Sequence, residues 1–465
     1  MKIKNMQWNK ATPADQRTFE PEIVFEAGLR RHHIANTAYP IHHQTTMRAY
    51  RVARDEVESM TAAAWRDVDT LGLYVHVPFC KARCKYCEYT VVGENEAEGV
   101  YFDALLREFD LYRQQLDTPR KTLIGFDIGG GTPSFVGLDN IRRVVEAARA
   151  SFRFRPGLAI SIETTPIIAE REPGKLHAFY QMGIERISMG VQTTHVKLAR
   201  SMEREYTGLT MLERAVRNVR DAGFRRFNVD LMYGFDEQSP DMWRATVEQA
   251  IGLGPEYITL YQMRYKGTRM QEHATRVTRQ AVNELAAVAR DLLLAAGYSG
   301  TAGKNTYSRA PDDVGTSDYL TERVVKGTPY LGLGLGAQSL SHHTLSYNQG
   351  AASKSLKPYL RAVDAGRLPI QDIYHLGLDA AMAKMLSVSF YFGEIHLEHF
   401  WTKFGVHLED HFSREVDFVL RRGLMEYAGP YLRLTPHGAR HFNGVVSLFY
   451  AGAVKEYLVN PRSET

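Results

Sequence analysis

The stretch YVHVPFCKARCKYC, residues 74–87, joins an apolar run typical of a β-strand to three closely spaced cysteines. Cys80, Cys84 and Cys87 have the spacing C-x3-C-x2-C and are the only cysteines among the 465 residues. Thiolates are soft ligands, and a loop this tight directs three of them at one metal centre. A closed zinc site or a [4Fe–4S] cluster usually takes four protein ligands, so three cysteines leave one position open for another molecule.

Other interpretations of the cysteines remain open from the residues alone. The first is a zinc site with His76 as the fourth ligand. The second is that the thiols are buried as small hydrophobic groups, and the third is that two cysteines form a disulfide and one stays free. The spacing and its place after a strand resemble the radical S-adenosylmethionine (SAM) superfamily. This resemblance implies that Cys80, Cys84 and Cys87 hold three irons of a [4Fe–4S] cluster and that the fourth iron chelates SAM.

The composition is that of an ordinary globular protein. Hydrophobic residues make up 44% of the chain and charged residues 24%, which predicts one large domain with smaller additions. The net charge of +4 does not favour a nucleic-acid partner. We find no apolar run of membrane-spanning length and no apolar leader, so we expect a cytoplasmic protein with no membrane partner. A reducing compartment also suits clustered cysteines that form no disulfide framework.

From about residue 70 to 300 the pattern alternates predicted strands and helices. Repeated βα units of this kind predict an α/β protein with a partial (β/α)6 barrel related to the TIM barrel. Ligands are then expected at the carboxyl ends of the strands. The predicted strands are 71–77, 122–128, 158–162, 186–189, 226–232 and 257–262.

We expect four parts in the chain. Residues 1–70 form an N-terminal extension and residues 71–300 the radical SAM barrel core. Residues 301–369 complete the barrel and include the glycine-rich stretch YLGLGLGAQS, and residues 370–465 form a mainly helical, winged-helix-like C-terminal domain. No basic recognition stripe accompanies this last part, so a helical cap on the barrel is at least as good an interpretation as a nucleic-acid contact.

Polar residues stand at or just after the carboxyl ends of the predicted strands. The turn GGGTP at 129–133 lets a ligand approach the backbone, and with the cysteine loop it resembles the radical SAM segment that contacts the methionine amino group. Glu163 is suited to accept hydrogen bonds from an ammonium or a ribose diol. Arg204 is suited to pair with the SAM carboxylate, and Asp230 to hold a ribose hydroxyl. Gln192 places an amide at the end of its strand.

The ordered set of motifs resembles the oxygen-independent coproporphyrinogen III oxidase branch of the superfamily. The shared segments include YVHVPFC, GGGTP, SMGVQ, NVDLMYGF, LGLGLGA and LTPHG, and they run from Leu73 to about Phe449. The resemblance implies that Tyr74 and Tyr86 lie by the cluster and SAM, and that Gln338 lies near a second SAM molecule. The residues that it implies for the first SAM are Gly130, Gly131, the adjacent Thr132, Glu163, Gln192, Arg204 and Asp230.

Two departures from that branch bear on the reaction. The oxidase itself carries a further cysteine two residues past the third, where this chain has Glu88-Tyr89. The haem-chaperone relatives carry an HNxxYW sequence where this chain reads GTSDYL at 315–320. By elimination, the chain most resembles the class C radical SAM methyltransferases and cyclopropane-forming enzymes. Oxidative decarboxylation of a porphyrinogen-type propionate and non-enzymatic haem carriage are the alternatives.

The class C resemblance implies a reaction with two SAM molecules. A reduced cluster cleaves the first to a 5′-deoxyadenosyl radical, which takes hydrogen from the methyl group of the second. The resulting radical adds to an unsaturated carbon of a small natural-product-type substrate, which is methylated or cyclopropanated. We expect a reductant such as flavodoxin or ferredoxin, and by position Tyr74, Glu88 or Tyr89 as the group that transfers the proton.

Overall fold

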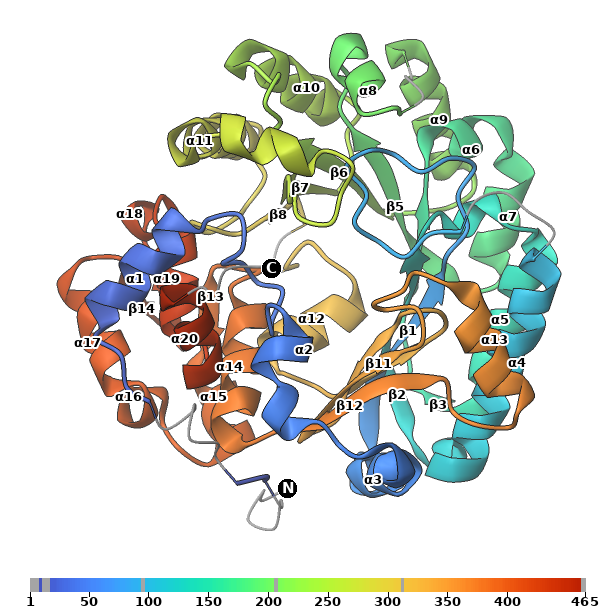
Figure 1. Ribbon diagram of the computed structural model, residues 1–465. Helices are drawn as coiled ribbons and strands as arrows, with labels where there is room; N and C mark the ends of the chain where they lie inside the picture. The colour runs from blue at the N-terminus through green and yellow to red at the C-terminus, as the bar shows by residue number, and fades with distance from the viewer. Residues whose placement is uncertain (1–7, 11–16, 93–96, 205–207, 311–312, 461–465) are drawn as a thin grey trace.

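The computed structural model describes residues 8–10, 17–92, 97–204, 208–310 and 313–460. Its centre is a sheet whose six predicted strands all form and run parallel, in the order β1-β2-β4-β5-β6-β7 (Figure 1). The α/β class and the βα alternation are therefore confirmed. The strands are β1 (Thr70–Val77), β2 (Thr122–Gly130), β4 (Ile160–Thr164), β5 (Ile184–Gln192), β6 (Arg226–Tyr233) and β7 (Tyr257–Gln262).

Helices between these strands lie along the outside of the sheet (Figure 1). Helix α9 has an apolar stripe at helical spacing that is buried at Leu212, Ala215, Val216 and Val219, and the helix ends ahead of Gly223. Helices on the outer face leave the strands buried, which explains their almost continuous apolar runs. The outer helices are α4 (Glu98–Leu116), α5 (Leu138–Ser151), α6 (Pro166–Arg171), α7 (Pro173–Gln181), α8 (Val196–Ser201), α9 (Leu209–Asp221), α10 (Pro240–Gly252) and α11 (Arg279–Ala295).

The glycine-rich stretch supplies the other neighbour of β1. Strand β9 (Tyr330–Leu333) runs parallel to β1, and β10 (Gln338–Leu340), β11 (Thr344–Asn348) and β12 (Ile370–His375) continue the sheet in antiparallel fashion. At the far end β8 (Thr306–Ser308) is antiparallel to β7, and the short β3 (Arg153–Phe154) pairs with β2. In the described part of the chain β8 and β12 are the unpaired ends, so the barrel is partial. The sheet thus extends to His375, inside the range predicted as the C-terminal domain.

Helix α12 (Asp318–Val325) lies within the ring of strands and packs on β1 and β2 (Figure 1). Gly125 of β2 makes this packing possible, because a Cβ there would lie 2.3 Å from the Cα and 2.4 Å from the backbone nitrogen of Tyr319. Backbone atoms cannot rotate away as a side chain can. Helix and strand would have to separate to admit any larger residue.

Replacing Gly125 by alanine is therefore expected to destabilise the protein by about 1–3 kcal/mol or more, since overpacking here moves backbone. Thermal or denaturant unfolding measures the change. Gly99→Ala in α4 is the matched control, because nothing lies within 4 Å of a Cβ at Gly99. Alanine is the better helix former, so Gly99→Ala is expected to leave stability unchanged or raise it by up to about 1 kcal/mol. Equal stabilities of the two variants would contradict the packing argument.

The N-terminal extension and the C-terminal region share one hydrophobic core, separate from the barrel core. Val24 and Phe25 belong to it together with Val445 and Leu448, and α1 lies beside α19 and α20 (Figure 1). The first part of the extension is thus an integral layer on the C-terminal region, whereas Ala64 and Trp65 of α3 belong to the barrel core. The helices of the extension are α1 (Pro21–Arg30), α2 (His43–Thr46) and α3 (Val57–Trp65), and those near the C-terminus include α19 (Phe442–Leu448) and α20 (Gly452–Val459).

The rest of the C-terminal region is mainly helical, as predicted, with a small antiparallel sheet of order β13-β15-β14. The segment LRLTPHGARHFN, which contains the shared motif LTPHG, forms the end of a strand, a turn and a helix, and α20 follows it. No helix among the described residues is long and apolar enough to cross a membrane. The other elements are α13 (Leu356–Asp364), α14 (Leu378–Ser389), β13 (Glu394–His396), α15 (Leu397–Phe404), α16 (Leu408–His411), α17 (Ser413–Arg421), β14 (Met425–Ala428), β15 (Tyr431–Leu434) and α18 (Pro436–Ala439).

Candidate active site

The cysteine loop follows β1 directly and is fixed by backbone hydrogen bonds to two other segments. The amide of Lys85 donates to the carbonyl oxygen of Met202 (2.9 Å), just after α8. The amide of Thr132 donates to the carbonyl oxygen of Phe79 (2.8 Å), which joins the loop to the turn after β2. The loop therefore lies at the carboxyl ends of the strands, where a (β/α) barrel places its ligands.

Cys80, Cys84 and Cys87 are free, partly exposed thiols. The Cys80 Sγ lies 3.4 Å from the hydroxyl of Thr132, and the Cys84 Sγ lies 3.8 Å from a guanidinium nitrogen of Arg204. Burial raises the pKa of Cys80 to about 11 and also raises the pKa of Cys87. The metal-free thiols of Cys80 and Cys87 are therefore neutral, and a metal centre would bind them with release of their protons.

His76 has partners other than the cysteines. One ring nitrogen lies 2.9 Å from the carbonyl oxygen of Thr90, and the other lies 3.3 Å from the hydroxyl of Tyr74. Among the described residues, no group of three or more His, Cys, Asp or Glu side chains, the cysteines included, is arranged to hold a metal ion, so the hydrogen bonds of His76 are what argue against zinc. A zinc loop completed by His76 therefore does not fit this geometry.

The glycine turn after β2 packs directly on the cysteine loop. A Cβ on Gly131 would lie 2.6 Å from the carbonyl oxygen of Phe79, and Gly130 has a φ of +119°, which residues with side chains rarely adopt. We predicted that these glycines leave room for a ligand. At Gly131 that room is occupied by the cysteine loop, so this glycine brings the end of β2 into contact with the loop.

Glu163 of β4 and Asp230 of β6 are carboxyl groups that stay open to solvent, Glu163 exposed and Asp230 half-buried, although protein atoms surround both. Glu163 accepts a hydrogen bond from the backbone amide of Gly130 (3.3 Å). Asp230 accepts hydrogen bonds from the hydroxyl of Ser188 and from the side-chain amide of Asn228 (2.7 Å each). Burial and the charge of Asp230 raise the pKa of Glu163 to about 8. Burial also raises the pKa of Asp230. Such a pair favours a cationic ligand, because an ammonium group would offset two carboxylate charges.

Gln192 and Arg204 lie at and beyond the end of β5. Gln192 has a left-handed backbone (φ +68°), and its Oε1 is buried with no hydrogen-bond partner among the described residues. Arg204 donates to the carbonyl oxygen of Gly190 and to the hydroxyl of Tyr86 (2.9 Å). A buried amide oxygen without a donor is rare in folded proteins, so Gln192 suits a polar ligand that supplies one.

The three residues predicted to transfer a proton have different surroundings. The hydroxyl of Tyr74 is buried beside His76, and burial raises its pKa well above the ordinary value, which makes it a weak acid. Glu88 forms an ion pair with Arg264. Tyr89 is 55% exposed and is the most accessible of the three. Their assignment as proton donors stays a prediction.

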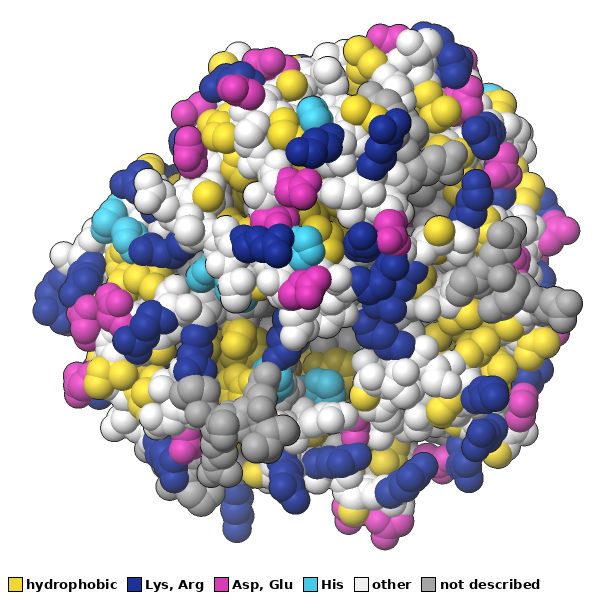
Figure 2. Space-filling view, turned by 45° about the horizontal axis from the view of Figure 1, so that its top comes forward, with side chains coloured by type: hydrophobic (Ala, Val, Ile, Leu, Met, Phe, Trp, Pro, Cys, Tyr) yellow, Lys and Arg dark blue, Asp and Glu magenta, His cyan; other side chains and the backbone are white. Residues whose placement is uncertain are grey.

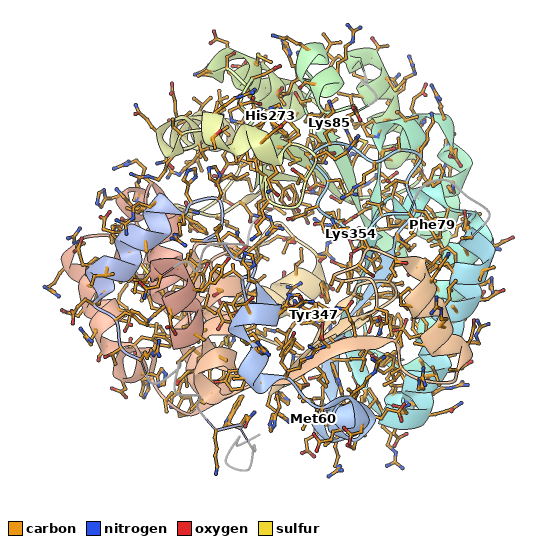
Figure 3. The ribbon with its side chains drawn as sticks, viewed as in Figure 1. Met60, Phe79, Lys85, His273, Tyr347 and Lys354 are labelled. Atoms are coloured by element: carbon orange, nitrogen blue, oxygen red, sulfur yellow. The ribbon has the colours of Figure 1, made fainter. Side chains whose placement is uncertain are left out.

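Gln338 stands at the start of β10, which β9 separates from β1. Its side-chain oxygen accepts hydrogen bonds from the hydroxyl of Tyr330 and from the ammonium group of Lys384 (3.3 Å). Tyr347, labelled in Figure 3, lies opposite Gln338 on β11. Gln338 therefore belongs to a polar network on β9–β11 that is distinct from the residues around the cysteine loop.

Basic side chains surround the cysteine loop at the surface. Lys81 and Arg83 are exposed within it, and Lys354 donates from its ammonium group to the carbonyl oxygen of Glu88 (2.9 Å). Figure 3 shows Lys85 and Lys354 on different sides of the opening in the ring. Figure 2 shows lysine and arginine side chains gathered beside a hollow that also displays hydrophobic and histidine side chains. The entrance near the loop is thus locally more basic than the net charge indicates.

Residues 74–250 match the family model of the Radical SAM superfamily. This chain carries a radical SAM domain. The matched range starts at Tyr74 in β1 and ends in α10, so it contains the cysteine loop, the glycine turn and the carboxyl groups of Glu163 and Asp230. The protein is accordingly an enzyme of that superfamily.

Similarity to known proteins extends beyond the radical SAM domain. The oxygen-independent coproporphyrinogen III oxidase of Paracoccus denitrificans is 29% identical over 70% of this chain and 73% of its own length, and that of Escherichia coli is 28% identical over 63% and 65%. The solved structure of the E. coli coproporphyrinogen III oxidase has a TM-score of 0.73 at 22% identity and covers 89% of this chain and 96% of that chain. This chain therefore has the fold of the E. coli oxidase. The two relatives compared above are both oxygen-independent coproporphyrinogen III oxidases.

A radical SAM domain implies a [4Fe–4S] cluster and SAM. The residues present fit both groups. Three free thiols match a cluster that leaves one iron for SAM, and this explains why the loop has no fourth protein ligand. The carboxyl groups of Glu163 and Asp230 suit the ammonium and ribose groups of SAM, and the Gln192 oxygen needs a donor that a polar ligand brings.

The sequence analysis missed several polar residues of the ring interior. Asp127 of β2 accepts a hydrogen bond from Ser317 (2.6 Å), its other oxygen is buried without a partner among the described residues, and burial raises its pKa to about 6. Arg186 of β5 is 5% exposed. Both interrupt apolar strands, which is the signal that identifies them. Arg323 and Lys384 were missed as well, although Lys384 is the one cation within the apolar helix α14.

Proposed function

We propose that the protein oxidises a porphyrinogen-type tetrapyrrole and converts a propionate side chain to a vinyl group with loss of carbon dioxide. The observation that carries this proposal is how far the similarity to coproporphyrinogen III oxidases extends. The alignments cover 70% of this chain for the Paracoccus protein and 82% for the Synechocystis protein. They therefore reach beyond residues 74–250, into regions that a shared cofactor alone would not preserve.

In this proposal Cys80, Cys84 and Cys87 ligate the cluster. Glu163 accepts hydrogen bonds from the SAM ammonium group, and the Arg204 guanidinium attracts the SAM carboxylate. When bound, the cluster and SAM supply a 5′-deoxyadenosyl radical for hydrogen abstraction. Each propionate then loses one hydrogen atom and one carbon dioxide, and an acceptor must take up the remaining electron. A reductant such as flavodoxin or ferredoxin is the proposed electron donor to the cluster.

A second candidate function is methyl transfer or cyclopropane formation with a second SAM molecule. Tyr89 favours it, because this position is a cysteine in the oxidases that the chain resembles. Gln338 is the residue proposed for the second SAM. Its side-chain oxygen is already bonded to Tyr330 and Lys384, so a second SAM would either use its NH2 group or displace one of these partners.

Anaerobic turnover with methyl-deuterated SAM separates the two candidates. The reconstituted protein is incubated with a reductant and coproporphyrinogen III, and carbon dioxide, 5′-deoxyadenosine and its deuterium content are measured. We expect one carbon dioxide per 5′-deoxyadenosine and no deuterium transfer, because the oxidase takes hydrogen from the substrate.

Deuterium in 5′-deoxyadenosine would instead identify the SAM methyl group as the hydrogen source and support methyl transfer. SAM cleavage without carbon dioxide release would contradict the decarboxylase proposal. Protein without iron is the control, since SAM must then remain intact. A pure haem carrier would cleave no SAM even with the cluster reconstituted.

A further inference from the structure

A narrow pocket lies between the inner helix α12, strand β9 and the C-terminal helices α14 and α15. Three cations from three of these elements line it, namely Arg323, Lys384 and Lys403. Its remaining wall is mostly apolar and includes Tyr330 and Leu340. The free volume accepts about one water-sized group, such as one oxygen of a carboxylate, rather than a whole cofactor.

None of these cations has a carboxylate at salt-bridge distance in the described part of the chain. Lys384 is 3% exposed and donates to the carbonyl oxygen of Tyr39 (2.6 Å) and to Gln338. Lys403 donates to the carbonyl oxygen of Gly327. The guanidinium of Arg323 lies over the ring of Tyr330 (4.5 Å), and its Nε is buried without a partner among the described residues.

The nearest acidic side chain on α12 is engaged elsewhere. Glu322 pairs with Lys326 (2.8 Å) and Arg155 (3.5 Å). Burial lowers the pKa of Lys403 to about 8, and burial together with the charge of Arg323 lowers the pKa of Lys384 well below its ordinary value. Uncompensated buried charge is costly, and an anion entering the pocket would offset it.

The pocket adjoins the same interior as the predicted SAM residues. Aromatic rings join the two, because the ring of Tyr319 lies 6.0 Å from that of Tyr74 and 5.9 Å from that of Tyr330, over which Arg323 lies. The hydroxyl of Tyr391 feels the charges of Asp230 and Arg323. That hydroxyl is also hydrogen-bonded to Tyr261 of β7. On the other side, Lys384 contacts Gln338 at the start of β10. The cations therefore lie beside the residues predicted for SAM, with the rings of Tyr319 and Tyr330 between them.

We propose that Arg323, Lys384 and Lys403 bind a carboxylate arm of the substrate and thereby hold its reacting carbon toward the radical SAM site. This inference deepens the proposed function, because a tetrapyrrole with propionate side chains has several such arms. The same chemistry would serve the carboxylate of a second SAM molecule. Binding measurements on the pocket variants distinguish these two sources.

The first experiment uses the whole chain without reductant and does not depend on turnover. Propionate and its neutral isostere propionamide are compared for their effect on the melting temperature at constant ionic strength. We expect propionate alone to raise it, in a saturable way, because a ligand that binds only the folded state stabilises that state. Lys384→Met and Arg323→Met are expected to lose this shift. Lys357→Met, which removes an exposed lysine from α13, is expected to keep it.

The second experiment measures the fluorescence of coproporphyrin III, the oxidised tetracarboxylate, on titration with the same proteins. We expect binding to weaken by about tenfold or more in Lys384→Met, since a hydrogen bond to a charged group is lost, and to be unchanged in Lys357→Met. The affinity for SAM is expected to be the same in the wild type and in every variant. Weakened SAM binding with unchanged coproporphyrin III binding would assign the carboxylate to SAM and overturn the substrate assignment.

Failure of this inference and failure of the proposed function give different results. If propionate and propionamide act alike on the wild type, the pocket does not bind carboxylates, whatever reaction the enzyme catalyses. The other result is that coproporphyrinogen III is not decarboxylated but the rise in melting temperature with propionate depends on Lys384. The pocket then binds carboxylates, and the substrate is another carboxylic acid. Melting curves of each variant without ligand establish that it is folded.

Discussion

Replacing Cys84 by alanine is expected to abolish both cluster binding and SAM cleavage. Only two thiols would remain in the chain, and two cannot hold three irons of a cubane cluster. Anaerobically reconstituted wild-type protein should contain about four irons and four sulfides per chain, and the variant close to none. Production of 5′-deoxyadenosine with reductant is expected to fall below detection, because the electron for cleavage of SAM passes through the cluster.

Ala82→Ser is the matched control for this prediction. Ala82 is exposed in the same loop, so serine adds a small polar group without removing a ligand. The control is expected to keep its iron content and SAM cleavage, and both variants should melt at temperatures similar to that of the metal-free wild type. A Cys84→Ala protein that retains a full cluster and cleaves SAM would refute the assignment of the three cysteines.

The parallel core was predictable because its strands are buried on both faces. Buried parallel strands read as apolar runs in the sequence, and all six predicted runs became strands. The first and last residues of the strands differ by a few positions from those predicted. The predicted strand 186–189, for example, is the centre of Ile184–Gln192, whose far end carries the bulge near Gln192. Strand ends depend on the turns and neighbours, which an apolar run does not encode.

The parts of the fold that depend on distant contacts were not predictable. The glycine-rich stretch carries no signal that its strand β9 pairs with β1, some 250 residues earlier in the chain. The same holds for the core shared by α1 and α19. Neither contact can be read from the local hydrophobic pattern. The apolar residues of each segment show only that it is buried, and they do not show which distant segment covers it.

The candidate site was predictable where strand ends bring residues together. Cys80 follows β1, and Glu163 and Asp230 lie in the carboxyl-terminal halves of β4 and β6, so a common location near the carboxyl ends follows from the parallel topology. The cation pocket was not predictable, since Arg323, Lys384 and Lys403 come from separate helices that only the tertiary structure assembles. Its single local signal is a lysine in the otherwise apolar α14.

Glu163→Gln is expected to remove a pH dependence from both stability and SAM binding. Burial and the charge of Asp230 raise the pKa of Glu163 to about 8 in the folded protein, from an ordinary value of 4.5. Between these two values the folded state holds a proton that the unfolded chain has released. The free energy of unfolding of the ligand-free wild type therefore falls as the pH rises through this range, and by less than for a fully buried group, because solvent reaches the Glu163 side chain.

Glutamine cannot titrate, so the variant should lack this decline, while Glu248→Gln on the exposed face of α10 should retain it. An ammonium ligand prefers the carboxylate form, so wild-type affinity for SAM should rise with pH by up to about tenfold per unit below the pKa of Glu163. In Glu163→Gln the affinity should be weaker and less dependent on pH. Denaturant unfolding and equilibrium SAM binding across the range measure both effects. An unchanged pH profile of SAM binding in Glu163→Gln would show that this carboxyl group does not hold the ammonium, and the contact would then belong to Asp230 or to the glycine turn.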